Sequence, residues 1–281
     1  MMRSPSGNCV MASAAELSSR PAERALDRID TGPRFSEADA IRLNRMFRAS
    51  DTHELLTAVL KDGIAGDVAL VSSFGAESAV LLHLAAQVDP NVPVLFLDTD
   101  KHFPETLAYR DELVARLGLT NMQVLTPDPA DIATKDDNGL RWSWDPDGCC
   151  ELRKVRPLAK ALAHVDASLT GRKAFQSSGR ATLPRFEVDA SDAQGRLKIN
   201  PLIDWSAADI DAYFEAHDLP RHPLVEQGYL SIGCSPCTRP VNPGEDPRAG
   251  RWAGWEKTEC GIHVPGEAGD EDLPPDYEPV F

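Results

Sequence analysis

Short apolar runs alternate along this chain with longer segments that have helical periodicity. Each run is four or five residues long, the length of a buried strand, and is bounded by polar or turn-forming residues. The predicted strands cover residues 68–71, 93–97, 122–125, 167–170 and 197–200. This spacing leaves room for a helix between most successive strands.

The intervening segments have the sequence features of helices. Residues 79–88 are apolar enough for a buried helix, and the helix at 104–117 opens with Pro104 and stops at Gly118. Further helices are expected from Ser36, after Asp51, over residues 151–164 and from Ser206. Alternating strands and helices predict an α/β fold, a mostly parallel sheet with helices on both faces.

Composition divides the chain into three parts. Residues 1–34 are rich in Ser, Ala, Pro and Arg, and we expect this segment to be disordered. Residues 35–225 carry the α/β pattern and form the expected domain. In residues 226–281 the pattern fades into a segment rich in Gly, Pro and charge. We expect this last part to be a functional C-terminal extension.

The overall charge restricts the partners. Lys and Arg number 29 against 44 Asp and Glu, a formal net charge of −15. Such a surface repels nucleic acid and anionic membranes, although a local basic cluster can still bind an anion. No apolar run approaches the roughly 20 residues of a membrane span, and the start lacks the apolar core of a secretory signal. We therefore predict a cytoplasmic protein with no nucleic-acid or membrane partner.

Four of the six cysteines form two pairs. Cys149 and Cys150 are adjacent, and Cys234 and Cys237 are separated by two residues. In a reducing compartment such pairs are more often metal ligands or redox groups than disulfides. Four thiolates suit either a structural zinc ion or an iron–sulfur cluster. Because adjacent side chains diverge, the first pair fits a zinc knuckle poorly, so the spacing favours iron–sulfur and leaves zinc as the alternative.

The turn after the first predicted strand is a candidate anion site. Ser72, Ser73 and Gly75 keep it small, and the following helix would direct backbone N–H groups at a bound anion. In open α/β sheets, ligands bind at the carboxyl ends of the strands. The turn lacks the glycine patterns of Walker and Rossmann loops. On this stretch alone, a plain strand-to-helix connection is an equal alternative.

Basic residues follow both cysteine pairs. Arg and Lys side chains there would suit the oxygens of a phosphate or sulfate, whereas a solvated charged face is the simpler explanation for any single one of them. The residues are Arg153, Lys154, Arg156, Arg239, Arg248 and Arg251. In a protein of net charge −15, their position near the cysteines indicates an anionic substrate.

Cys260 is the candidate nucleophile. Basic neighbours can lower the pKa of a thiol so that it reacts at neutral pH. Gly261 would let this segment move, and His263 would assist. A lone cysteine near a terminus is otherwise usually inert.

Taken together, the stretches from about residue 68 to residue 263 closely resemble the assimilatory adenylyl-sulfate and phosphoadenylyl-sulfate reductases. That family has a nucleotide-binding α/β fold related to the PP-loop ATP pyrophosphatases. It reduces an activated sulfate to sulfite and AMP, or the 3′-phosphorylated form of AMP, with thioredoxin as the usual electron donor. The resemblance implies that residues 35–225 bind a nucleotide and that the partner is thioredoxin or a glutaredoxin-like donor.

The resemblance also implies a role for individual residues. It makes Cys260 the nucleophile that forms an S-sulfonate, and it makes the two cysteine pairs, Cys149, Cys150, Cys234 and Cys237, the ligands of a 4Fe–4S cluster. The implied substrate-binding residues are Ser72, Ser73, Phe74, Gly75, Glu77, Leu97, Asp98, Thr99, Lys154, Gly171, Arg172, Lys173, Arg248, Arg251 and His263. The sequence departs from the family at Asp100, where Gly is usual, and at Ala174, where a basic residue is usual.

The four cluster cysteines bear on the substrate. Members that have them mostly use adenosine 5′-phosphosulfate (APS), and some also accept the 3′-phosphorylated compound (PAPS), so PAPS or dual specificity stays the alternative. A PP-loop ATP pyrophosphatase is a rival enzyme, and a zinc-stabilised binding module is the rival outside catalysis. The sequence leaves the oligomeric state, monomer or homo-oligomer, open.

Overall fold

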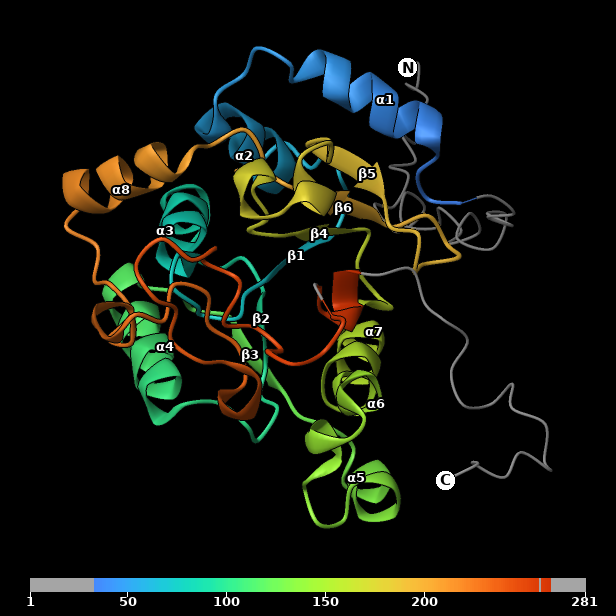
Figure 1. Cartoon of the computed structure of the whole chain (residues 1–281). Helices are drawn as coiled ribbons and strands as arrows, with labels where there is room; N and C mark the ends of the chain where they lie inside the picture. Colours follow the sequence, from blue (N-terminus) through green and yellow to red (C-terminus); the bar gives the residue numbers. More distant parts are fainter. Residues whose placement is uncertain (1–32, 258, 264–281) are drawn as a thin grey trace, which may run out of the picture. The chain divides into compact units, whose positions relative to one another are not determined.

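Six short strands form a single sheet in the order β3-β2-β1-β4-β6-β5 (Figure 1). The computed structural model describes residues 33–257 and 259–263. The expectation of disorder over residues 1–34 falls almost entirely outside these ranges, as do residues 264–281 of the expected C-terminal extension. Both stay predictions.

Five strands are parallel and lie where the apolar runs predicted them. They are β1 (Val68–Val71), β2 (Val94–Leu97), β3 (Met122–Leu125), β4 (Ala167–Leu169) and β6 (Leu197–Ile199). The sixth, β5 (Phe186–Val188), is antiparallel to β6 and was not predicted. Its three residues are too few to show a pattern, although Phe186 is fully buried.

Helices fill most of the connections. They are α1 (Glu37–Met46), α2 (Thr52–Leu60), α3 (Ser78–Val88), α4 (Pro104–Leu117), α5 (Pro129–Lys135), α6 (Pro146–Cys150), α7 (Arg156–Leu162) and α8 (Ala207–Ala216). Ser36, Asp51 and Ser206 cap α1, α2 and α8 with their side chains, as the sequence indicated. The short helix α5 was not predicted, because none of its residues is buried.

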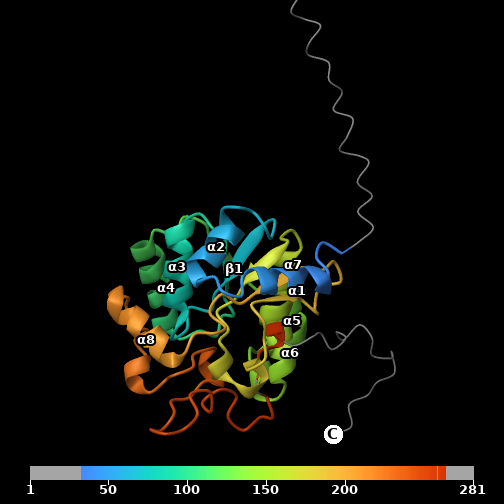
Figure 2. The same ribbon diagram turned by 90° about the horizontal axis from the view of Figure 1, so that it is seen from above.

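Alternate residues of the central strands face opposite layers. Leu70 and Phe96 belong to the larger core, with residues of α2, α3, α4 and α8. Ala69 and Leu95 face a smaller core that includes Leu158 of α7. Figure 2 accordingly shows β1 between α3 and α4 on one side and α6 and α7 on the other. The predicted fold class, a mostly parallel sheet covered on both faces, is confirmed.

The helix expected over residues 151–164 is instead two segments, and a short helix that was not predicted precedes them. The helix α6 ends at Cys150, a π-helical turn η2 follows (Glu151–Val155), and α7 begins at Arg156. Pro157 has no N–H to donate back along the helix, and the wider turn lies directly before it. Such turns change the direction of side chains and are frequent at functional sites.

The order of the strands puts a topological switch point between β1 and β4. The chain continues from β1 to β2 on one side, and the later strand β4 pairs with β1 on the other. Ligands of open α/β sheets bind outside the carboxyl ends of strands at such a point. Ser72 follows β1 there and Thr170 follows β4. Among the described residues, none of the helices is long and apolar enough to span a membrane.

Candidate active site

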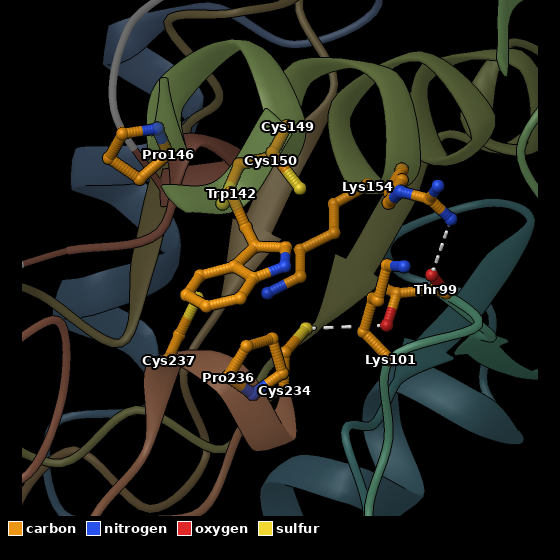
Figure 3. Close-up of a pocket in the computed structure, with 11 residues that line it drawn as sticks. Thr99, Lys101, Trp142, Pro146, Cys149, Cys150, Lys154, Cys234, Pro236 and Cys237 are labelled. Atoms are coloured by element: carbon orange, nitrogen blue, oxygen red, sulfur yellow. Dashed lines mark hydrogen bonds between the residues drawn. The ribbon is translucent and has the colours of Figure 1, made fainter. Parts of the chain in front are cut away.

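Two short helical segments bring the four paired cysteines to one pocket (Figure 3). Cys149 and Cys150 end α6, and Cys234 precedes the turn η6 (Ser235–Cys237) that Cys237 closes. All but the half-buried Cys237 are buried. The Ser235 N–H donates to the carbonyl of Lys101 at 2.7 Å, which fixes this turn to the loop after β2.

The cysteine pocket has the donors of a metal site but not the spacing of a single-ion site. Burial, and next the neighbouring Cys234, raise the pKa of Cys149 to about 11. A bound metal centre would reverse this, because coordinated thiols are deprotonated. Within the described part of the chain, His, Cys, Asp and Glu side chains nowhere gather in threes closely enough to hold one metal ion. Four soft thiol donors around one pocket are candidate ligands for a metal centre.

Lys154 extends from the π-helical turn into the space between the two cysteine segments (Figure 3). Burial alone would lower its pKa, but Cys234, Cys260 and Cys150 outweigh burial and raise it. The ammonium group is therefore a permanent positive charge beside these thiols. The role in substrate binding that the resemblance implied for Lys154 stays a prediction.

The predicted nucleophile Cys260 lies on the tail segment 259–263 (red in Figure 1), which contacts η2 and ends in the short turn η7 (Gly261–His263). The Cys150 thiol donates a hydrogen bond to Cys260. This bond lowers the Cys260 pKa well below its ordinary value against the effect of burial, with Lys154 and the Ile262 N–H adding to it. A lowered pKa is what a nucleophilic thiol needs. His263 belongs to the same turn.

Arg251 is a positive charge available to an anion. Its guanidinium lies over the ring of Trp252 at 4.4 Å, and its Nη1 is 3.5 Å from the hydroxyl of Ser231. Within residues 33–257 and 259–263 its buried Nε has no hydrogen-bond partner and no carboxylate pairs with it. Stacking on Trp252 fixes the plane of the guanidinium without neutralising it. The neighbouring Arg248 instead faces Glu259, at 3.4 Å.

The charged side chains of the expected substrate loop after β4 form hydrogen bonds and ion pairs with other residues of the protein. Arg172 is buried, donates to Thr170 and Asn200, and forms an ion pair with Glu187. Lys173 is also buried, and its ammonium donates to Glu77 at 2.8 Å. The same ammonium donates to the carbonyl of the exposed Gly171 at 3.0 Å.

The turn after β1 combines buried and accessible groups. Ser73 is exposed, whereas Phe74 is fully buried, packs edge-on against Phe96, and has a φ of 48°. Its ring therefore belongs to the core. The hydroxyl of Ser72 accepts from the Phe74 N–H at 3.2 Å. A side chain at Gly75 would come within 3.3 Å of the Ile232 carbonyl, which accounts for a glycine there.

The segment after β2 faces the cysteine pocket. The Leu97 side chain packs in the smaller core, Asp98 is half-buried, and the Thr99 hydroxyl lies 3.3 Å from the Cys234 sulfur. Asp100 has a φ of 56°, a left-handed conformation that Gly adopts freely and Asp tolerates. Its carboxylate is 3.2 Å from the Arg153 guanidinium.

Several polar residues of the site were not predicted. Asp136 forms a buried ion pair with Arg153, Arg180 pairs with Glu259, and Lys257 pairs with Asp147. Local sequence gives no indication of these pairs, since their members are far apart along the chain. Of the residues missed in this way, only Lys257 could have been found from the sequence, because it lies three positions before Cys260.

The comparisons with known proteins agree with this geometry. Residues 67–240 match the model of the phosphoadenosine phosphosulfate reductase domain. The chain is 49% identical to the adenosine 5′-phosphosulfate reductase of Mesorhizobium japonicum over 86% of its own length and 94% of the relative. With the protein of that name from Chelativorans sp. it shares 54% identity over 72% of this chain and 80% of the other.

A solved structure of a related reductase is also similar to this chain. The phosphoadenylyl-sulfate reductase of Candida auris, a phosphate complex, is 27% identical and superimposes with a TM-score of 0.62. The match covers 73% of this chain and 98% of that one. The parallel sheet and its candidate site, together with these matches, identify the chain as a member of the phosphoadenosine phosphosulfate reductase family.

Proposed function

We propose that this protein reduces adenosine 5′-phosphosulfate to sulfite and AMP. One observation carries the proposal: the segment that bears Cys260 packs against η2, and the charges of Lys154 and Arg251 stabilise the Cys260 thiolate. A thiolate surrounded by cations suits attack on an anionic electrophile. The relatives at 49% and 54% identity are named for the same reaction.

The first half-reaction is a sulfonyl transfer. The Cys260 thiolate attacks the sulfur of the phosphosulfate, and the bond from that sulfur to the phosphate oxygen breaks. AMP leaves with the electron pair, and Cys260 becomes an S-sulfonate. Lys154, Arg248 and Arg251 offset the negative charge that would otherwise repel a thiolate, an effect that can contribute several kcal/mol.

The second half-reaction requires a dithiol donor such as thioredoxin or a glutaredoxin-like protein. One donor thiolate attacks the Cys260 sulfur, and sulfite leaves with the electron pair of the sulfur–sulfur bond. The resulting mixed disulfide is attacked by the second donor thiol, which frees Cys260 and leaves the donor oxidised. The two electrons that reduce the sulfate group thus come from the donor.

The four pocket cysteines are the proposed ligands of a 4Fe–4S cluster. Their number, their soft donor chemistry and their position around one pocket support this assignment. When bound, the cluster would order the two cysteine segments and set the local electrostatic field. PAPS is the alternative substrate, since the structural relative from Candida auris is named for it.

The test is sulfite release by anaerobically purified protein, with APS or PAPS as substrate and a dithiol protein as donor. We expect a strong preference for APS and loss of sulfite release in Cys260→Ser. Cys9→Ser, which changes a cysteine outside the described residues, is the matched control and should retain activity. Turnover by Cys260→Ser at the rate of the control would refute the assignment of the nucleophile.

A further inference from the structure

We propose that Arg180 is a positioning residue that holds the Cys260 segment in place through the carboxylate of Glu259. The effect of Arg180 on catalysis rests on the proposed function, in which Cys260 is the nucleophile. Its structural basis lies in contacts that the sequence did not suggest.

The contact between Arg180 and Glu259 is a two-pronged ion pair. The Nε of Arg180 donates to Oε1 of Glu259 at 2.8 Å, and Nη2 donates to Oε2 at 2.7 Å. The two side chains are only 10% and 21% exposed. Paired, planar and partly buried contacts of this kind fix orientation as well as distance. Since Glu259 directly precedes Cys260, fixing its carboxylate limits where the thiol can lie.

The same carboxylate has two weaker partners. The Ser177 hydroxyl donates to Oε1 at 3.3 Å, and Nη2 of Arg248 lies 3.4 Å from Oε2. Burial alone would raise the pKa of Glu259, but Arg180 and Arg248 outweigh burial and lower it. Of these partners, Arg180 makes the shortest contacts with the carboxylate and the only paired ones among the described residues.

Arg180 is also linked by hydrogen bonds to Glu77, in the turn after β1. Its Nη1 donates to Oε1 of Gln176 at 2.5 Å, and Nε2 of Gln176 donates to Glu77 at 2.7 Å. Glu77 also accepts from the ammonium of Lys173. A continuous set of hydrogen bonds therefore runs from the turn after β1 to the residue before Cys260. Arg180 joins its two halves.

The first experiment follows the tail without substrate. Anaerobically purified holoenzyme is treated with iodoacetamide, and alkylation of Cys260 is followed by peptide mass mapping. We expect roughly tenfold faster alkylation in both Arg180→Gln and Glu259→Gln, a coupling of about 1.4 kcal/mol. The double variant should be no faster than either single one. Arg185→Gln, which breaks the ion pair with Asp204 near β5, is the control and should match the wild type.

The second experiment separates positioning from substrate binding. In steady-state assays with APS, Arg180→Gln and Glu259→Gln should each lower kcat by about tenfold and change KM less than twofold, without additivity. Arg180→Lys, which keeps the charge but not the fork, should recover only part of the rate.

Two results would overturn the proposal. One is unchanged alkylation in Arg180→Gln, and the other is independent, multiplying effects of the two single variants, which would make Arg180 a direct substrate ligand. Because alkylation needs no substrate, it tests whether Arg180 holds the Cys260 segment through Glu259 even if the protein fails to reduce APS. A wild type without APS reduction would count against the proposed function alone.

Discussion

The buried ion pair between Asp136 and Arg153 gives a quantitative prediction for Asp136→Asn. Oδ2 of Asp136 accepts from Arg153 Nε at 3.1 Å and Nη2 at 2.8 Å, and Oδ1 accepts from the Arg141 N–H at 2.8 Å. The two ion-paired side chains are 0% and 4% exposed. An asparagine has one acceptor oxygen for these donors and no charge. The substitution therefore leaves a buried guanidinium without its main counterion.

The expected loss of unfolding free energy depends on the interactions that Arg153 retains in the variant. Removing one member of a buried pair typically costs about 3–5 kcal/mol. Arg153 would still donate to the carbonyl of Thr99 at 2.8 Å and lie 3.2 Å from the exposed Asp100. We therefore expect the lower end, about 3 kcal/mol, which lowers the melting temperature by about 6–12 °C in a unit of this size.

The assay is thermal unfolding followed by circular dichroism, at pH 7 and one scan rate. Asp204→Asn is the matched control, because Asp204 pairs with Arg185 at 2.8 Å but is 66% exposed. Its cost should stay below about 1 kcal/mol. Equal shifts in the two variants would refute the view that the Asp136–Arg153 pair is a buried determinant of stability.

Three further predictions concern pH, charge and backbone. His222 is buried; its Nδ1 accepts from the Leu224 N–H and its Nε2 contacts Thr106. Burial, opposed by Glu105, lowers its pKa from 6.5 to about 4. The unfolded chain therefore takes up a proton first, so the unfolding free energy should fall as the pH drops from 6.5 to about 4; urea titrations should show a weaker slope in His222→Gln. Arg251→Lys loses the stacking on Trp252 and should weaken APS binding roughly tenfold, measured by calorimetry in a Cys260→Ser background; unchanged affinity would exclude contact with substrate. Asp100→Gly relieves the left-handed φ but loses the ion pair with Arg153, so its unfolding free energy should stay within about 1 kcal/mol of wild type, and a larger loss would mean that the pair is worth more than its exposure implies.

The fold was largely predictable because its strands are continuous apolar runs. The runs at residues 68–71 and 122–125 coincide with β1 and β3. The missing strand β5 has three residues and takes its stability from pairing with β6, which a local pattern does not record. The π-helical turn before Pro157 was also missed, although a proline at that position already indicates an interruption of the regular helix.

The site was predictable by residue type and less so by pairing. The sequence identified the four cysteines, Lys154 and Cys260 as candidates, and these side chains do lie together. It did not indicate that Arg172 pairs with Glu187, since the irregular loop between them has no pattern from which their relative positions could be predicted. Arg180 and Glu259 are 79 positions apart, so only the folded chain brings them into contact. The catalytic and ligand roles of these residues stay predictions.

The most direct test of the account is the chemical state of Cys260 after one turnover. The wild-type protein is mixed with APS in the absence of any thiol donor, and its peptides are analysed by mass spectrometry under non-reducing conditions. The account predicts one sulfonate group on Cys260, AMP released in equal amount, and sulfite release when a dithiol donor is added. AMP release without a modified Cys260, or a sulfonate on another cysteine, would contradict it.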